Sequence, residues 1–483
     1  MSSLARVFLT RNSRRLSRSV HVSASLKATE EAKEIGELSS HECSYPIAGK
    51  QVVRISAQQA VEHIKSGDKI FVHGIAATPT PLLNALCEHA KKKDLKHITL
   101  HHLHLEGPAP WATEEYKGII RSNSLFTGAN LRAGVNNGTV DFNSVFLSEI
   151  PLLFKRNVIN LNVALIHVSA PDSKGFCSLG TSVDATRSAI INADYIIAMV
   201  NQNMPRTFGD GLIHSSHIDG MVFCDFPLHE RPNSKLGDQE LKIGMTIAEH
   251  LVEDGATLQM GIGAIPDAAL VALKNHKDLG IHTEMFSDGV LDLVERNVIT
   301  NAHKKIHPGK IVSSFVYGSK RLYEFLHDNP MIFMGDVSWV NDTSMIRQNP
   351  KVAAINSAVE IDLTGQVVAD SVGSRFLSGF GGQIDFIRGA SLCNDGRGKP
   401  IIALPSQTKK GESKIVPFIK EGAGVVTTRA HVHYVVTEFG IAQLFGRNMR
   451  QRAFELIRIA HPDHQERLEE AAFSRLKVMP SPD

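Results

Sequence analysis

Residues 261–289 read GIGAIPDAALVALKNHKDLGIHTEMFSDG and combine three successive structural signals. It opens on a glycine turn, and apolar residues then recur at the three- and four-residue spacing of a helix. A short apolar segment follows and ends at a carboxylate, Glu284. A turn, a helix and a strand in this order are typical of an α/β fold.

The same order occurs twice in the chain. Residues 55–100 and 243–284 both begin with a helical stretch containing Glu-His, pass through a glycine into an apolar strand, and turn at a second glycine. In both copies a proline stands five residues after the turn glycine, and a Lys-Asp-Leu triplet precedes the next strand. Aligned on this triplet, Leu100 corresponds to Glu284. We therefore predict two tandem open α/β domains, related by internal duplication, with mainly parallel sheets.

The polar, proline-containing segment 225–242 separates the two copies. We place the first domain at residues 46–232 and the second at residues 240–475. Apolar runs predict further strands at residues 163–170, 195–200, 330–337 and 433–440. The charged segment 448–473 is predicted to be helical and to cover one face of the second domain.

The composition limits the classes of function. The 483 residues are 42% hydrophobic and 21% charged, with a net charge of +2, so no general attraction to nucleic acid is expected. No run of about 18 apolar residues occurs, so we expect no membrane span. The five cysteines are scattered without a CxxC pair, and the histidines of HHLH at 101–104 lack acidic or cysteine partners at metal spacing. We therefore expect free thiols and no metal site.

The first 28 residues differ from the rest of the chain. They are rich in arginine and serine, and no acidic residue occurs before Glu30. This composition is typical of a mitochondrial transit peptide and predicts a location in the mitochondrial matrix. The alternative is a basic tail that contacts an anionic surface.

Glu284 itself allows three interpretations. A glutamate at a strand end commonly forms only a surface salt bridge. Together with GIG, it also resembles the acid that follows a dinucleotide-binding turn, but Pro266 occupies the place of the third glycine in that motif. The third interpretation is a reactive carboxylate, because ligands of open α/β sheets bind beyond the carboxyl ends of the strands. The glycines then let a ligand approach the backbone, and Pro266 suits the first position of a helix whose free N–H groups face an anion.

Four motifs give the chain a specific resemblance. LQMGIGAIPDAAL, LGIHTEMFSDG, SGFGGQIDF and YVVTEFGIAQLFGR, in this order, resemble the acetyl-CoA hydrolase/transferase family, and most closely its 4-hydroxybutyrate and acetate CoA-transferases. The resemblance extends from about Pro46 to about Glu470. It implies two tandem α/β domains with the active site between them, which agrees with the internal repeat.

In that family the glutamate of the HTE motif is the nucleophile, and here this residue is Glu284. A carboxylate has a reference pKa near 4.3, so we expect it to be ionised at neutral pH without a base. It would attack an acyl-CoA thioester to give a mixed anhydride, and the released CoA would convert this to a glutamyl thioester. Because the bond energy is conserved, the resemblance implies neither ATP, metal nor another cofactor.

The resemblance also assigns binding residues. It implies that CoA lies along the turn formed by Gly261, Ile262, Gly263, Ala264 and Ile265. A second turn, with Ser378, Gly379 and Gly382, would bind CoA and supply an oxyanion donor from Gly382. Asn356 is expected to hydrogen-bond the Glu284 carboxyl, or to form an Asx turn. Lys409, in a basic loop with Lys410 and Lys414, is expected to bind CoA phosphates unless that loop is merely solvated.

We therefore expect a CoA-transferase acting on acyl-CoA and short-chain carboxylates such as acetate, succinate, butyrate or 4-hydroxybutyrate. The alternatives are an acetyl-CoA hydrolase, if water reaches the intermediate, and a catalytically silent CoA-binding protein. The sequence does not choose the pair of acids. The family implies a homo-oligomer, but no periodicity in the sequence identifies its interface.

Overall fold

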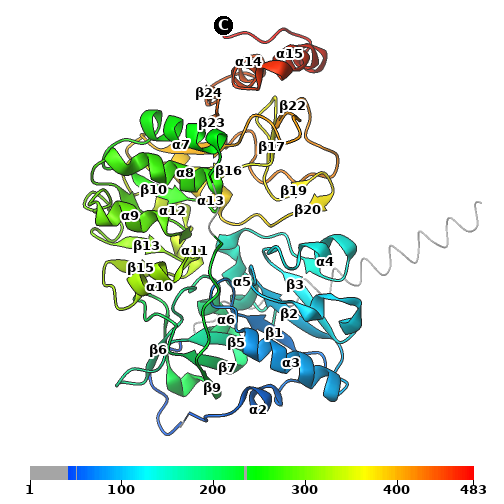
Figure 1. The fold of residues 1–483 in the computed structure, drawn as a ribbon, viewed down its shortest axis with the longest axis vertical. Coiled ribbons are helices and arrows are strands. Elements are labelled where there is room, and N and C mark those ends of the chain that lie inside the picture. The colour runs from blue at the N-terminus through cyan, green and yellow to red at the C-terminus, as the bar shows by residue number, and fades with distance from the viewer. Residues whose placement is uncertain (1–41, 51, 233–235) are drawn as a thin grey trace, which may run out of the picture.

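The computed structural model describes residues 42–50, 52–232 and 236–483. The predicted transit peptide at residues 1–28 lies outside these residues. Figure 1 shows two lobes, with the first half of the chain in one and the second half in the other. Among the described residues, no helix combines the length and the apolarity needed to cross a membrane.

The first lobe is built on a seven-stranded parallel sheet. Its spatial order is β4-β3-β2-β1-β5-β7-β9. The strands are β1 (Lys69–Val72), β2 (Ile98–His102), β3 (Ile120–Ser124), β4 (Asp141–Phe142), β5 (Leu161–Val168), β7 (Ala193–Asn201) and β9 (Gly220–Cys224). The central strands are buried on both faces, as parallel strands covered by helices require. The helices include α3 (Thr80–Lys92), α4 (Arg132–Asn137), α5 (Ile150–Lys155) and α6 (Thr186–Asn192).

The second lobe contains a six-stranded sheet in the order β11-β10-β16-β21-β23-β24. These strands are β10 (Thr257–Met260), β11 (Gly280–Ile281), β16 (Ala353–Ser357), β21 (Lys399–Ala403), β23 (Tyr434–Thr437) and β24 (Gly440–Gln443). All pairs are parallel except β23 with β24. The helices α7 (Asp238–His250), α8 (Ala264–Ala272) and α13 (Gln383–Ser391) belong to this lobe. The predicted α/β class with two tandem parallel-sheet domains is confirmed.

Three of the predicted elements differ in the structure. The predicted strand at residues 433–440 ends with β23 at Thr437, and Gly440 already begins β24. The predicted strand at residues 330–337 is only β15 (Ile332–Met334), because Asp336 caps the short helix α11 (Val337–Val340) by accepting from the Ser338 N–H. The charged segment forms two helices, α14 (Met449–Arg458) and α15 (Pro462–Leu476), because Pro462 starts a new helix. Their buried residues, among them Leu456 and Leu468, join the core of the second lobe.

The duplication is visible in the registers of the two sheets. In the first copy, Phe71 of β1 pairs with His101 of β2. In the second copy, Leu258 of β10 pairs with Ile281 of β11. Phe71 and Leu258 each stand three positions before the turn glycine of their copy, so the two pairs are equivalent.

This equivalence corrects the alignment of Glu284. Three residues beyond the paired positions are the turn glycines, Gly74 and Gly261, on one strand and His104 and Glu284 on the other. Glu284 therefore corresponds to His104, and the match to Leu100 is wrong. The sequence alignment failed because the link from the Lys-Asp-Leu triplet to the strand is longer in the first copy.

Candidate active site

The two glycine-rich turns and Glu284 meet at the carboxyl ends of the second sheet. The chain leaves β10 for β11 on one side and later adds β16 on the other side, so the strand order reverses between β10 and β16. Open α/β sheets bind ligands at such a switch point. Gly261 lies there and donates its N–H to the carbonyl of Ile355 in β16, at 3.1 Å.

Three donors of the segment 313–315 hold the backbone carbonyl of Glu284. Its carbonyl accepts the N–H groups of Ser314 and Phe315, each at 3.0 Å, and the hydroxyl of Ser313 at 3.2 Å. The side chain is partly exposed to a small cavity of about 30 Å³ between the lobes. The cavity is lined by Ile75, Leu103, His104, Phe126, Leu147, Ile262, Glu284, Phe315 and Gly381. Most of this lining is apolar, so the carboxylate has few polar neighbours.

Three groups set the ionisation of Glu284. Burial raises its pKa to about 7, and the nearby carboxylate of Asp385 also raises it. Hydrogen bonds from the Asn341 amide and the Gly382 N–H favour the charged form and oppose this rise. The Asn341 Nδ2 donates to Glu284 Oε2 at 3.2 Å. The rise of its pKa to about 7 opposes the expectation that Glu284 is fully ionised at neutral pH without help, and that expectation stays a prediction.

The second glycine turn, residues 378–382, lies between Glu284 and the first lobe. The Ser378 carbonyl accepts the Thr127 N–H at 3.2 Å, and the Gly381 carbonyl accepts the Leu147 N–H at 3.0 Å. A Cβ on Gly382 would overlap both Glu284 Oε2 and Asn341 Nδ2. The absence of a side chain at 382 therefore lets the backbone N–H reach the carboxylate, as an oxyanion donor requires.

The first glycine turn, residues 261–265, brings the start of a helix to the same place. Gly263 has φ +137° and is the residue before α8, whose first residues are Ala264 and Ile265. Ile262 is 42% exposed and lines the cavity beside Glu284. The sequence predicts Pro266 at the first position of the helix, but it is the third residue of α8. This position tolerates proline because the first four N–H groups of a helix have no partner within it.

Asn356 does not make the predicted hydrogen bond. Among the described contacts, its Nδ2 donates to Gln259 Oε1 at 2.8 Å, and Gln259 Nε2 lies 3.5 Å from Asn356 Oδ1. Asn356 lies near the switch point, but its side chain faces Gln259 in the adjacent strand β10. The amide that contacts Glu284 belongs instead to Asn341.

The three lysines of the basic loop lie in different surroundings. Lys409 and Lys410 are exposed in the turn between Thr408 and Glu412. Lys414 is half-buried, and its Nζ lies 3.5 Å from the carbonyl of Ala358, which follows β16. Burial lowers the pKa of Lys414. A contact of Lys409 with CoA phosphate stays a prediction.

The surroundings of the cysteines do not suit a reactive thiol, and those of the HHLH histidines do not suit a metal site. Burial raises the pKa of Cys43, Cys87 and Cys224 to about 11 and that of Cys177 to about 12. His102 is buried, with its ring nitrogens bonded to the Leu103 carbonyl and the Ser122 hydroxyl. Within the described part of the chain, no three His, Cys, Asp or Glu side chains gather at distances suited to a metal ion.

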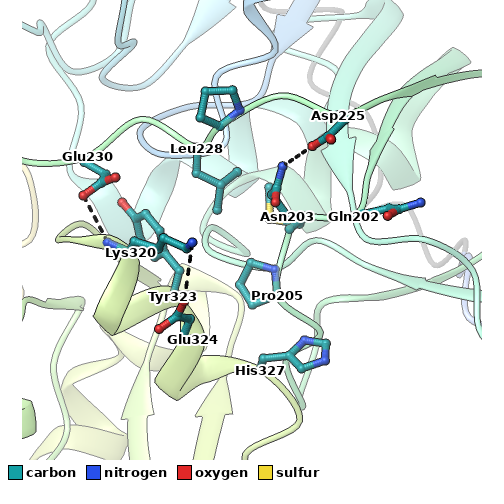
Figure 2. A pocket seen from close by; sticks show the side chains of 12 residues that line it. Gln202, Asn203, Pro205, Asp225, Leu228, Glu230, Lys320, Tyr323, Glu324 and His327 are labelled. Carbon is teal, nitrogen blue, oxygen red and sulfur yellow. Dashed lines mark hydrogen bonds and ion pairs between the residues drawn. The ribbon is translucent and has the colours of Figure 1, made fainter.

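A larger cavity lies elsewhere between the lobes. It has a volume of about 560 Å³, and its walls are the carboxyl ends of β7 and β9 on one side and α10 (Lys320–Leu326) on the other. Figure 2 shows its polar side chains, with Asn203 donating to Asp225 and Glu230 beside Lys320. Three carboxylates and one lysine line it, so it is poorly suited to the phosphates of CoA.

Sequence reasoning missed three residues of the site. Asn341 follows a four-residue helix and had no motif around it. Asp385 lies inside the SGFGGQIDF motif, where the glycines carry the recognisable pattern. Ser148, which donates its hydroxyl to Asp385, comes from the other lobe, where the sequence gives no signal.

Comparisons with known proteins agree with this geometry. The family model described as "Acetyl-CoA hydrolase/transferase N-terminal domain" matches residues 48–226, and that of the "Acetyl-CoA hydrolase/transferase C-terminal domain" matches residues 318–472. Residues 236–317, which include α7, β10 and Glu284, belong structurally to the second lobe but lie between the two matches.

Individual relatives match along most of the chain. The "Succinyl-CoA:acetate/propanoyl-CoA:succinate CoA transferase" of Fasciola hepatica is 59% identical, over 87% of this chain and 87% of that protein. The "4-hydroxybutyrate coenzyme A transferase" of Clostridium kluyveri is 47% identical, over 86% of this chain and 96% of that protein. The solved 4-hydroxybutyrate CoA-transferase of Porphyromonas gingivalis is 38% identical, with a TM-score of 0.74, over 87% of this chain and 97% of that one. The chain therefore belongs to the acetyl-CoA hydrolase/transferase family and is an enzyme of its CoA-transferase type.

Proposed function

We propose that this protein transfers CoA between short-chain carboxylic acids through a covalent intermediate on Glu284. The observation that carries the proposal is the position of the Glu284 carboxylate, in a small apolar cavity with two hydrogen-bond donors, Asn341 Nδ2 and the Gly382 N–H, directed at it. Such donors stabilise the oxyanion of a tetrahedral intermediate, and the loss of one typically costs about 2.7–4 kcal/mol.

The chemistry proceeds in balanced steps. A Glu284 oxygen attacks the thioester carbon, the C–S bond breaks, and CoA leaves as the thiolate with a mixed anhydride on the enzyme. The thiolate attacks the glutamyl carbon, and the first acid leaves as its carboxylate. The carboxylate of a second acid then runs the two steps in reverse and leaves as its CoA ester, with Glu284 restored. Because no phosphate or electron is exchanged, we expect neither ATP nor metal nor another cofactor, and activity should survive EDTA.

We further propose where CoA lies. The first glycine turn stands at the switch point, and the first N–H groups of the helix that follows it have no partner within that helix. CoA would extend along Gly261–Ile265 and past Ile262, with the thioester at Glu284 and Gly379–Gly382 on the opposite side. Lys409 and Lys414 are the candidates for its phosphates.

The size of the cavity favours small acyl groups. A volume of about 30 Å³ leaves space for about two water molecules, and the walls are mainly aliphatic and aromatic. We therefore propose acetate as one of the two acids. Succinate is proposed as a partner because the relative from Fasciola hepatica is named for succinyl-CoA, acetate and propanoyl-CoA; butyrate and 4-hydroxybutyrate remain candidates, named in other relatives.

Water in this cavity would turn the same intermediate into a hydrolytic one. The test is to measure CoA release from acetyl-CoA alone and the formation of succinyl-CoA or butyryl-CoA when succinate or butyrate is added. A transferase forms the new ester much faster than it releases free CoA. Free CoA as the main product under both conditions would favour the acetyl-CoA hydrolase. If the protein catalyses neither reaction, the remaining alternative is a catalytically silent CoA-binding protein.

We also propose that the protein acts in the mitochondrial matrix and as a homo-oligomer. The first proposal rests on the basic, acid-free composition of residues 1–28. A fusion of residues 1–30 to a fluorescent protein should enter mitochondria, and a cytosolic signal would contradict it. Sedimentation of the purified protein tests the second proposal.

A further inference from the structure

Asp385 is a buried carboxylate next to the site, and the proposed reaction does not consume it. It is the third residue of α13 and only 8% exposed. Its Oδ1 accepts the hydroxyl of Ser148 at 2.9 Å, and the Ser148 backbone N–H also donates to it. Its Oδ2 accepts from Asn341 Nδ2 at 3.3 Å. Asp385 is thus bound to the first lobe and to the amide that contacts Glu284.

The Asn341 amide joins the two carboxylates. The same Nδ2 lies 3.2 Å from Glu284 Oε2 and 3.3 Å from Asp385 Oδ2. An amide nitrogen has two hydrogens, so each carboxylate receives one of them. Asn341 Oδ1 is buried and has no hydrogen-bond partner among the described residues. The two acceptors therefore determine the orientation of the amide, since nothing holds its oxygen.

Only one of these acceptors is constant during the reaction. When Glu284 becomes an anhydride or a thioester, it loses its charge and one of its acceptor oxygens. Asn341 is then most needed, because attack on the glutamyl carbon creates an oxyanion where Nδ2 now points. Without a second acceptor, the amide could turn its free oxygen toward the developing negative charge, which would be repulsive.

We propose that Asp385, held by Ser148, is a positioning residue that keeps the Asn341 amide directed at Glu284 throughout the covalent cycle. This inference rests on the proposed function. Ser148 belongs to the segment Leu147–Glu149 of the first lobe, and the Leu147 N–H bonds to the Gly381 carbonyl. The arrangement is therefore complete only when the two lobes are in contact.

The charge of Asp385 gives the proposal a second readout. Glu284 faces the carboxylate of Asp385, and His104 lines the same cavity; Asp385 itself also faces Glu149. The like charge of Asp385 raises the pKa of Glu284, and burial raises the pKa of Asp385 itself to about 7, so the two carboxylates titrate as a pair. Removal of Asp385 lowers the pKa of Glu284. The acidic limb of the pH–rate profile then moves to lower pH.

The test uses the full-length enzyme and follows the CoA adduct on Glu284. The adduct is formed with acetyl-CoA, excess ligand is removed, and its decay on addition of acetate is timed. We expect Asp385→Asn to slow this decay by about 10- to 100-fold, the range typical when a group that orients a site ligand is lost. We expect a smaller slowing in Ser148→Ala, which keeps the Asp385 carboxylate but removes one of its hydrogen-bond donors.

Asp362→Asn is the matched control. Asp362 is also buried in the same lobe, accepts bonds from Thr364 and Gln366, pairs with Arg475, and has no described contact with Glu284. It should lose stability without changing adduct decay or the acidic limb. Decay at the wild-type rate in Asp385→Asn and Ser148→Ala, or equal slowing in Asp362→Asn, would overturn the inference. If the wild type forms no adduct, it is the proposed function that fails.

Discussion

The backbone of Gly382 and the carboxylate of Glu284 lie so close that no side chain fits between them. A Cβ at 382 would overlap Glu284 Oε2 and Asn341 Nδ2, although Gly382 itself has an ordinary backbone conformation. Glycine is thus required at position 382 because the backbone lies close to the carboxylate, and not because the chain adopts a conformation that only glycine allows.

Gly382→Ala should therefore damage catalysis more than folding. The added methyl group must displace Glu284 or Asn341, so one oxyanion donor is misplaced, and we expect kcat to fall by about 10²- to 10³-fold. Steady-state kinetics and circular dichroism measure the two effects. A folded variant with near-normal kcat would show that the Gly382 N–H takes no part.

Gly261→Ala should behave differently. A Cβ there would meet Ile355 O at 3.5 Å and Asn356 Oδ1 at 3.8 Å, which are ordinary contacts. The protein without CoA can thus accept alanine at position 261. The added methyl group would, however, collide with CoA bound along the turn. We expect normal thermal stability with KM for acyl-CoA raised about tenfold or more, as loss of about 1.4 kcal/mol of binding gives. An unchanged KM would place CoA away from this turn.

The raised pKa of Glu284 makes a prediction about stability. An unfolded glutamate titrates near 4.3, but in the folded protein the pKa of Glu284 is about 7. Between these values the native state binds more protons than the unfolded state, so stability falls as pH rises. Glu284→Gln removes this cost, and we expect it to be more stable than the wild type at pH 8, by on the order of 1–3 kcal/mol, but not at pH 4.

Thermal unfolding of both proteins at the two pH values measures this difference. Glu324→Gln is a suitable control, because Glu324 has a side chain that is 67% exposed, on α10. It should change stability little at either pH. A Glu284→Gln protein less stable than the wild type at pH 8 would mean that the carboxylate is solvated or paired.

Glu284→Asp tests the geometry while keeping the charge. One methylene less withdraws the carboxylate by about 1.5 Å from Asn341 Nδ2, and a misplacement on the order of 1 Å can cost about 100-fold in rate. We expect transfer to fall by at least this factor, as measured by conversion of acetyl-CoA to a second ester. Activity within a few-fold of the wild type would indicate that the position of the carboxylate is not critical.

The sequence predicted those parts of the fold and site that local pattern determines. Glycine turns, helix periodicity and the duplicated order lie in short segments, so the parallel sheets and the position of Glu284 at a strand end could be predicted. The register could not, because the link before the second strand differs in length between the copies, and this shifted the match from His104 to Leu100.

Side-chain partners were beyond the same reasoning. Asn356 stands near a strand end, where an active-site amide is expected, yet it pairs with Gln259 across the ladder. Asn341 is 57 residues from Glu284 in sequence and reaches it only through the packing of α11. The raised pKa of Glu284 depends on burial by both lobes, which no segment of the sequence contains alone.

The central claim is that Glu284 forms a covalent bond with the substrate, and the most direct measurement is mass spectrometry of the protein after incubation with acetyl-CoA and no acceptor. We predict a CoA thioester on the peptide that contains Glu284, its loss on addition of acetate, and its absence from a folded Glu284→Ala protein that no longer transfers CoA. An adduct on another residue, or CoA transfer at a near-normal rate by Glu284→Ala, would contradict the account.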